Sequence, residues 1–247
     1  MFGGQIVKTK EHGDLFKAEL VRALLNTKPG TIGKPIDPTK PAKGQTRRVV
    51  KASNSRVNGE PSNRYDWTRF DFSRATVDPL AHPVLKVPYL DENNNERIHT
   101  VTPKWIEGDG MWVKETFIQA HAVGGYAEGV DPETDPHGPT IDIIYRADDG
   151  ANERTAGPWT SSIFMPRKLS RISMEIVDIW PERIQDITNN DAWAEGMIGE
   201  LKPVHQHVEM VDYIGPFRKI WDSINGKDYP LENNDWVWVR EFRMVSL

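Results

Sequence analysis

Lys43-Gly44-Gln45-Thr46-Arg47-Arg48-Val49-Val50-Lys51 is the stretch of this 247-residue sequence that carries the most structural and chemical information. Residues 46–51 predict a short β-strand, because β-branched side chains favour extended backbone. A lysine close to a threonine hydroxyl can serve as base and nucleophile, provided that burial or neighbouring cations lower the lysine pKa. Arg47 and Arg48 supply such cations. Because basic runs are usually solvated surface, simple exposure of these side chains remains the alternative.

The stretch belongs to a basic block within an acidic chain. Residues 40–74 include nine basic and three acidic residues, a local charge of +6 in a chain of net charge −5. Such a block favours contact with a polyanion at one site, although a solvated loop is equally compatible with it. Aromatic residues alternate with arginines in residues 64–74, so this segment could stack on bases and contact phosphates.

The composition excludes several classes of protein. The chain has no cysteine, 27% charged residues and nine tryptophans, which rules out disulfides, cysteine-based metal sites and a wholly disordered chain. No apolar run reaches the roughly 20 residues of a membrane helix, and charges interrupt the first twenty positions, where a signal peptide would be apolar. We therefore expect a cytoplasmic protein of one or two domains that has no membrane contact.

The sequence predicts neither a cofactor nor a metal. It lacks the Walker phosphate loop, the dinucleotide-binding glycine fingerprint, the GxSxG elbow and the HExxH motif. His205 and His207 would point the same way from a strand. Two histidines without a third ligand make an incomplete metal site, so we do not expect one there.

Hydrophobic patterning predicts few helices and several short strands. Asp14 is expected to cap a helix over residues 15–26, and Thr188 with Asp191 resembles a capping box for a helix that ends at Gly196. A further helix is expected over residues 216–224. Strands are expected at residues 84–90 and 97–102, joined as a hairpin, and at residues 111–118, 141–146, 172–180 and 235–245.

The segments between these elements are expected to be loops. Residues 27–44 are rich in proline, glycine and lysine and predict a long exposed loop, and residues 52–82 predict an irregular stretch. In contrast, residues 236–239 predict a strand that is buried on both sides. Short strands with few helices indicate an α+β protein built on a small mixed β-barrel.

Six segments resemble ASCH-domain proteins of phages and prophages, and they follow one another in the family's order. The first is residues 43–51, which are similar to the pattern GRKTQTRRVVK. Residues 108–116 resemble GDRLWVRET, and residues 144–148 with 162–167 resemble YRAD with SIHMPR. Residues 183–188 with 191–196 resemble RLQDI with DAxAEG. Residues 221–226 and 236–239 resemble WDSING and WVWV. Each match is weak alone, but together they cover nearly the whole chain.

The resemblance implies a PUA-like ASCH fold, a small mixed β-barrel with flanking helices and a positively charged cleft for RNA or nucleotides. Some small bacterial members of the wider family hydrolyse N4-acetylcytidine with a lysine, a threonine and a glutamate. The matching positions here are Lys43, Thr46 and Glu195. The resemblance therefore implies a metal-independent amidohydrolase that acts on a modified cytidine, as a nucleoside or within RNA, in the host cytoplasm if the protein is phage-encoded.

Acyl transfer is the mechanism that this hypothesis predicts. Neutral Lys43 activates Thr46 or a water, the nucleophile attacks the amide carbonyl, and Glu195 donates a proton to the departing cytosine amine. Backbone amides near Thr46 and one of Arg47 or Arg48 could stabilise the oxyanion. For Glu195 the alternative is a carboxylate at a helix end that pairs with a surface arginine.

The rival hypothesis is a non-catalytic module that binds RNA or another nucleic acid through phosphate contacts and base stacking. The candidate phosphate contacts are Arg47, Arg48, Arg167, Lys168 and Arg171, and the candidate stacking residues are Trp67, Phe70 and Trp112. A ribonuclease that uses the same cleft is a third possibility, and a factor that acts by protein contact is a fourth. The sequence does not determine the oligomeric state.

The chain also departs from the family pattern. We expect a single ASCH domain over residues 1–247, with insertions at residues 27–42, 52–82, 119–140 and 197–214, and Gly44 stands where the pattern has threonine. The added segments could form a lid or a partner surface. Either would enlarge the cleft beyond what a free nucleoside needs.

Overall fold

A computed structural model describes residues 11–121, 141–148, 158–205 and 208–246, and it has the α+β class that the sequence predicts. None of the helices in these ranges combines the length and the apolar character needed to cross a bilayer. Besides short 3-10 turns, the elements are β1 Glu11–Leu15, α1 Ala18–Leu25, β2 Gln45–Val49, β3 Ser55–Val57, β4 Glu60–Pro61, β5 Thr76–Val77, β6 Leu85–Leu90, β7 Glu96–Pro103, β8 Gly110–Lys114, β9 Phe117–His121, β10 Ile141–Tyr145, β11 Ser173–Arg183, α2 Asn189–Ala194, β12 Glu200–His205, β13 Val208–Asp212, α3 Ile214–Asn225 and β14 Trp236–Ser246.

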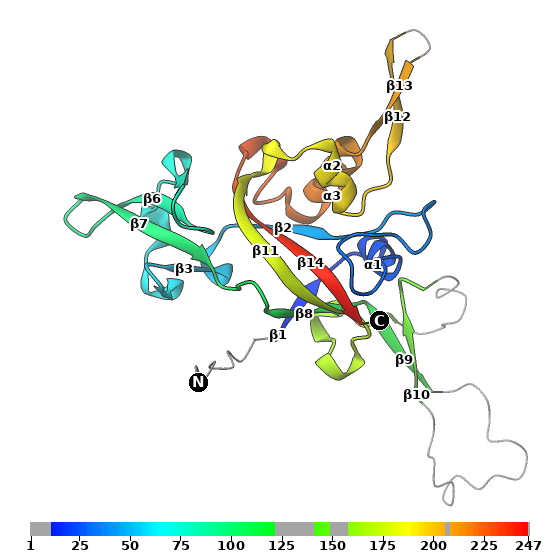
Figure 1. The fold of residues 1–247 in the computed structure, drawn as a ribbon. Coiled ribbons are helices and arrows are strands. Elements are labelled where there is room, and N and C mark those ends of the chain that lie inside the picture. Colours follow the sequence, from blue (N-terminus) through cyan, green and yellow to red (C-terminus); the bar gives the residue numbers. More distant parts are fainter. Residues whose placement is uncertain (1–10, 122–140, 149–157, 206–207, 247) are drawn as a thin grey trace, which may run out of the picture.

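A five-stranded sheet forms the centre of the molecule (Figure 1). Its order is β1-β8-β11-β14-β2, with β1 parallel to β8 and the other pairs antiparallel. Residues 236–239 were predicted to form a strand that is buried on both sides. This prediction is confirmed for Val237, Trp238 and Val239, which are fully buried. β2 is an edge strand of this sheet, and no other strand of the described residues pairs with its outer side.

Side chains connect the two edges of this sheet. Asp14 lies on the edge strand β1, and its carboxylate accepts a hydrogen bond of 3.0 Å from Arg48 on the opposite edge strand, β2. The same carboxylate pairs with Arg240 of β14 at 2.5 Å. The described strands nevertheless form open sheets rather than the closed barrel that the sequence suggested. The edges therefore meet through ion pairs and not through backbone hydrogen bonds.

A second five-stranded sheet, in the order β4-β3-β7-β6-β5, lies beside the first (Figure 1). It contains the predicted hairpin, β6–β7, but also β3, β4 and β5 from the segment that was expected to be irregular. Strands of two or three residues are too short to show periodicity, which explains why the prediction for residues 52–82 was wrong in part. The indole N–H of Trp238 donates to the Ser55 hydroxyl at 3.0 Å and links the two sheets.

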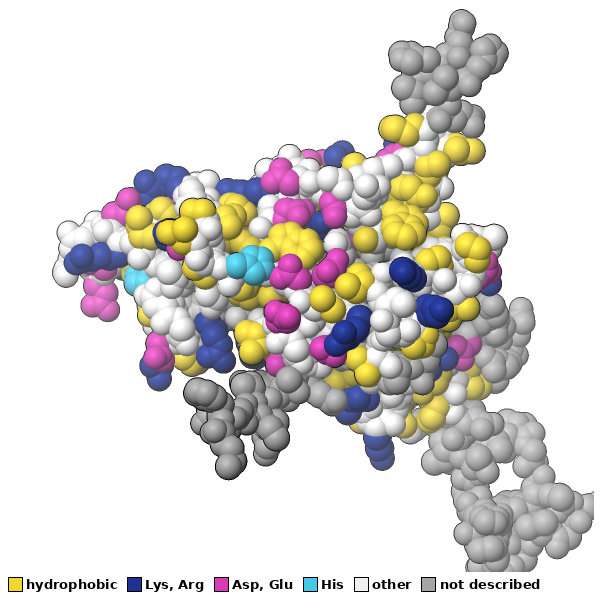
Figure 2. Space-filling model, in the orientation of Figure 1, with side chains coloured by type: hydrophobic (Ala, Val, Ile, Leu, Met, Phe, Trp, Pro, Cys, Tyr) yellow, Lys and Arg dark blue, Asp and Glu magenta, His cyan; other side chains and the backbone are white. Residues whose placement is uncertain are grey.

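Two further hairpins project from the body of the molecule: β9–β10, and β12–β13 beside α2 and α3 (Figure 1). The β12–β13 hairpin accounts for most of the predicted insertion at residues 197–214, and hydrophobic side chains run along it (Figure 2). Leu201 and Met210 are 66% and 56% exposed. Of the predicted insertion at residues 119–140, positions 122–140 lie outside the described residues.

The first helix begins later than predicted. Asp14 and Leu15 belong to β1, and α1 starts at Ala18 with Lys17 as its N-cap residue. Asp14 does not cap the helix because its carboxylate binds Arg240 and Arg48, and two charge-assisted pairs are stronger than one helix cap. Of the apolar positions that predict this helix, Leu20, Ala23 and Leu24 are buried, whereas Leu15 in β1 is 44% exposed.

The strand predicted over residues 111–118 is two strands, β8 and β9, in different sheets. The chain changes direction at Glu115, whose carboxylate binds Arg171 through hydrogen bonds of 3.0 and 2.8 Å. The predictions for β2, β10, β11, α3 and β14 are confirmed, and α2 has the predicted capping box of Thr188 and Asp191. The loop at residues 27–44 is irregular as predicted, but Thr27, Ala42 and Lys43 within it are fully buried.

Candidate active site

A cleft of about 360 Å³ lies along the free edge of β2. Its apolar walls come from Phe16 before α1 and from Phe217 and Trp221 of α3. Its polar lining includes Asp14, Lys17, Thr46, Arg47, Arg48, Lys51, Glu195 and Asn225. Of the three predicted catalytic residues, Thr46 and Glu195 line the cleft directly.

Lys43 and Glu195 form a buried ion pair at this edge. The Lys43 ammonium donates to Glu195 Oε2 at 2.6 Å and to the Glu195 backbone carbonyl at 2.8 Å. The Lys43 side chain is 0% exposed, so it lies behind Glu195. Burial lowers the pKa of Lys43 to about 8, although the Glu195 carboxylate opposes this shift. A neutral amine at Lys43 is therefore accessible close to neutral pH.

The backbone around this pair is fixed by local contacts. The Lys43 amide donates to the Thr27 hydroxyl at 3.0 Å, and the Gly44 amide donates to the Ala194 carbonyl at 2.9 Å. Gly196 has φ +87°, and a Cβ at this position would lie 2.8 Å from Ala23 Cβ and 3.3 Å from Lys43 Cβ. Only glycine therefore lets the chain leave α2 directly over Lys43.

The glycine at position 44 has a local explanation. A Cβ on Gly44 would lie 2.8 Å from the backbone nitrogen of Gly33 and 3.0 Å from its Cα. Gly33 belongs to the segment that we interpreted as an insertion. Residues around Gly33 therefore pack where a side chain at position 44 would be.

Arg47 holds the Glu195 carboxylate from the side opposite Lys43. Its guanidinium lies 3.2 Å from Glu195 Oε1, 3.0 Å from Glu182 and 3.8 Å from Asp191. Its side chain is 0% exposed. Arg47 therefore orients Glu195, and three carboxylates already occupy the guanidinium that we had considered for phosphate contacts.

Thr46 and Arg48 lie on the other face of β2, because successive side chains of a strand alternate. Thr46 Oγ1 accepts a hydrogen bond of 2.9 Å from Arg48, so the hydroxyl keeps its own proton for another acceptor. The Phe16 ring lies 5.7 Å from the Lys43 ammonium and 5.1 Å from the Arg48 guanidinium. Among the described residues, no hydrogen bond joins Thr46 to Lys43 or Glu195.

The free edge of β2 also presents backbone amides. The Phe242 amide donates to the Gly44 carbonyl and the Val50 amide donates to the Trp236 carbonyl, both at 2.9 Å. The even-numbered residues of β2 therefore face β14, and the amides of Gln45 and Arg47 point to the free edge. Of these two residues, Arg47 lines the cleft, so its amide could meet an anion that forms beside Glu195.

The remaining predicted binding residues lie elsewhere. Trp112 alternates along β8 with the buried residues Met111 and Val113, so it occupies the opposite face of the central sheet. Its ring lies 5.4 Å from the Lys114 ammonium and 5.8 Å from the Arg167 guanidinium.

The other basic and aromatic candidates have different surroundings. Lys168 is exposed near Arg167, whereas Arg171 is paired with Glu115 and Asp148. Trp67 stacks on Phe72, with 5.4 Å between ring centroids, and Phe70 is 8% exposed. The aromatic segment of the basic block thus packs the second sheet.

Two charged residues of the cleft region were not predicted from the sequence. Asp14 was interpreted as a helix cap, and Arg240 was not singled out, yet Arg240 is 1% exposed and shares Asp14 with Arg48. Burial would raise the pKa of Asp14, but the charges of Arg240 and Arg48 hold it well below its usual range. The available signal was an arginine directly after a fully apolar strand segment.

The described residues contain no cluster of three or more potential metal ligands among His, Cys, Asp and Glu. His207 of the histidine pair lies outside the described residues. Comparison of the chain with protein-family models, with curated proteins and with solved structures finds no match to any of them.

Proposed function

We propose that this chain is an ASCH-type protein with a PUA-like fold, and that the cleft at Lys43 and Glu195 hydrolyses the N4-acyl amide of a modified cytidine. The products are the unmodified cytidine and a carboxylate. No metal is required, because Lys43 and Glu195 can carry the proton between them.

The fold assignment is supported by the curvature of the central sheet. Asp14 on one edge strand reaches Arg48 on the other, so the sheet curls far enough for its edges to interact. The three α-helices in the described part of the chain are short and flank this sheet (Figure 1). A partly closed mixed sheet with flanking helices is compatible with a PUA-like arrangement.

The observation that carries the proposed reaction is the contact of 2.6 Å between a fully buried lysine and a glutamate that lines a cleft. Burying a charge is costly, so a buried charge persists in a protein where it is paired and used. The lysine, threonine and glutamate that the resemblance implies as the triad lie around one strand edge. Their residue types and placement suit proton transfer to and from an amide.

Glu195 is the member of the pair that reaches the substrate. The nucleophile, Thr46 or a water, attacks the carbonyl carbon of the acyl group, and its proton passes to Glu195 and on to Lys43. The C–N4 bond then breaks, and the proton returns through Glu195 to the cytosine nitrogen, which leaves as a neutral amine. With Thr46 as nucleophile, water hydrolyses the acyl-threonine in a second step. The Arg47 amide is suited to hold the oxyanion.

A nucleic-acid-binding module is the second candidate. The observation in its favour is that the Lys114 ammonium and the Arg167 guanidinium lie 5.4 and 5.8 Å from the Trp112 ring, with the exposed Lys168 nearby. Cations beside an aromatic ring suit contacts to phosphate and base. Binding of this kind would weaken steeply with salt and would not need Lys43.

Hydrolysis of N4-acetylcytidine, followed by chromatography without added metal, tests the proposal. We expect the wild type to release cytidine and Glu195→Gln to be at least 100-fold slower, because the amide keeps the contact to Lys43 but cannot transfer a proton. Thermal unfolding of both proteins checks that the variant is folded. A Glu195→Gln variant that folds and retains the wild-type rate would refute the assignment.

A further inference from the structure

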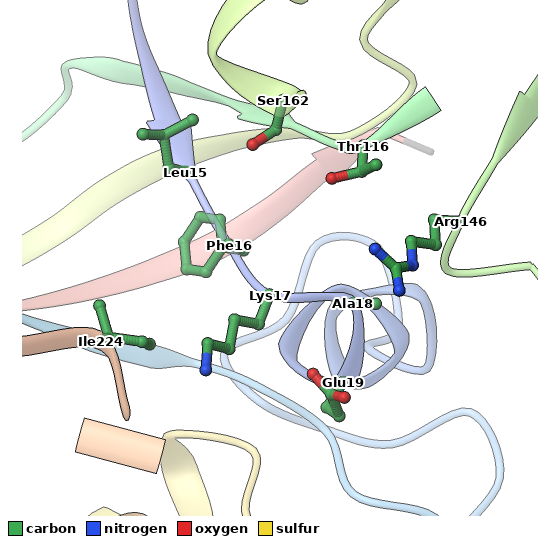
Figure 3. A pocket seen from close by; sticks show the side chains of 9 residues that line it. All are labelled: Leu15, Phe16, Lys17, Ala18, Glu19, Thr116, Arg146, Ser162 and Ile224. Carbon is green, nitrogen blue, oxygen red and sulfur yellow. The ribbon is translucent and has the colours of Figure 1, made fainter. Parts of the chain in front are cut away.

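A second cavity, of about 580 Å³, adjoins the cleft at Lys43 and Glu195. Leu15, Phe16, Lys17 and Ile224 line both, so the two hollows run into one another. Figure 3 shows the side chains that line the second cavity. A substrate seated in the cleft therefore has room to extend past Phe16 and Lys17.

Arg146 faces this second cavity (Figure 3). Its side chain is exposed, and no carboxylate among the described residues pairs with it. In contrast, Arg47, Arg48 and Arg171 are all in ion pairs. Arg146 is therefore a guanidinium that remains available to a ligand.

The turn that carries Arg146 is held firmly. The Arg146 amide donates to the Thr116 carbonyl at 2.9 Å, and the Ala147 carbonyl accepts from Arg22 of α1 at 3.0 Å. On either side, the Tyr145 hydroxyl donates to the Leu169 carbonyl at 2.7 Å and Asp148 pairs with Arg171 at 2.7 Å. Because the backbone is already fixed, only the Arg146 side chain has to be ordered when it binds an anion. This turn is part of the 144–148 segment, which the proposed reaction does not use.

The other polar groups of the cavity suit the same ligand. The Lys17 ammonium donates to the Ser223 hydroxyl at 2.6 Å and has further N–H groups to offer. The side chains of Thr116 and Ser162 also line the cavity, and Glu19 is the acid among the lining residues. A guanidinium, an ammonium and hydroxyls are the groups that bind phosphate in proteins.

We infer that this cavity binds a phosphate of the substrate, so that the ligand is a phosphorylated cytidine derivative rather than a free nucleoside. The inference that the ligand carries an acylated base rests on the proposed function, whereas the inference of a phosphate contact at Arg146 does not. A nucleotide monophosphate and an RNA phosphodiester share this chemistry, and the experiment separates them.

Calorimetric titration with cytidine, cytidine 5′-monophosphate and a short cytidine oligonucleotide tests the inference. In the wild type the phosphate should strengthen binding about tenfold or more, since hydrogen bonds to a charged group are among the strong ones. Arg146→Ala should remove most of this gain, and Glu19→Gln should increase it. Arg218 on α3 is exposed and does not line either cavity, so Arg218→Ala is the matched control and should behave as the wild type.

The results distinguish the ligand sources and the two hypotheses. Tighter binding of the monophosphate identifies a nucleotide ligand, and a gain seen with the oligonucleotide alone identifies RNA. Equal affinity for cytidine and both phosphorylated ligands, or a gain that survives Arg146→Ala, overturns the inference. If N4-acetylcytidine and its 5′-monophosphate both stay intact while the Arg146-dependent gain persists, the proposed function fails and the phosphate site stands. If both are hydrolysed with the same kcat/KM, the proposed function stands and the phosphate site fails.

Discussion

The Lys43 amine is the group on which the proposed chemistry depends at the scale of a single residue. It is fully buried, yet it lies one hydrogen bond from a carboxylate that lines the cleft. Burial favours the neutral amine, and the Glu195 charge favours the ammonium. The balance brings the pKa to about 8, where a proton can be taken up and returned.

The pH dependence of hydrolysis follows from this pKa. Because neutral Lys43 is the form that accepts a proton, and this form accumulates as the pH rises past about 8, the single-turnover rate should rise about tenfold per pH unit below that value and level off above it. Stopped assays from pH 6 to 10 measure this rate. A flat profile, or a rate that falls over this range, would contradict the role of Lys43.

The hydroxyl of Thr46 can be tested with two substitutions. If Thr46 is the nucleophile, Thr46→Val should lower the rate at least 100-fold, whereas Thr46→Ser should retain most of it. The unfolding free energy of both variants should lie within about 1.5 kcal/mol of the wild-type value, because the hydroxyl contributes one hydrogen bond, from Arg48. Full activity in Thr46→Val would assign the attack to water.

At the scale of the elements, the free edge of β2 brings the site together. The loop before β2 supplies Lys43, the end of α2 supplies Glu195, and the segment between β1 and α1 supplies Phe16. These segments are far apart in the sequence, and their close approach depends on two glycines, Gly44 and Gly196. Small changes in the backbone should therefore disturb the chemistry.

Gly196→Ala tests this close approach. The new Cβ would meet Ala23 and Lys43 at 2.8 and 3.3 Å in a backbone of φ +87°, so we expect a loss of about 2 kcal/mol or more in unfolding free energy and a slower reaction. Gly30 has φ +76° but nothing within 4 Å of an added Cβ. Gly30→Ala should cost about 1 kcal/mol and leave the rate unchanged. Equal effects of both variants on stability and rate would contradict the packing argument.

Asp14 tests how the sheet edges are joined. Asp14→Asn leaves Arg240 buried without its carboxylate partner, so urea denaturation should show a loss of about 3 kcal/mol or more. The exposed pair of Asp37 and Lys40 provides the comparison, and Asp37→Asn should leave the unfolding midpoint in place. An unchanged midpoint for Asp14→Asn would show that the edges do not depend on this charge.

The sequence predicted the secondary-structure elements better than the contacts between them. Long apolar strands such as β11 and β14 and the capping box of α2 were predictable, because their signals are local. The role of Asp14 was not, since a carboxylate before an apolar stripe is typical of a helix cap and its partners Arg48 and Arg240 are distant in sequence. For the candidate site, the residue types at Lys43, Thr46 and Glu195 could be selected in advance. The exposed Arg146 beside the cleft became evident only from the packing of its turn.

At the scale of the whole molecule, the two five-stranded sheets share one core. A single cluster of buried side chains includes Val57, Leu85 and Val101 of the second sheet and Met174, Ile176 and Trp238 of the first. Tryptophan fluorescence and far-ultraviolet circular dichroism should therefore report the same unfolding midpoint in urea. Two separate transitions would show that residues 52–103 fold independently of the central sheet.

The most direct test of the central claim is a single-turnover experiment with the wild-type protein in excess over N4-acetylcytidine at pH 8.5, analysed by chromatography for cytidine and acetate. The proposed function predicts stoichiometric release of both products without added metal. The same experiment with N4-acetylcytidine 5′-monophosphate covers the phosphorylated substrate. Intact starting material in both reactions would contradict an amidohydrolase at Lys43 and Glu195.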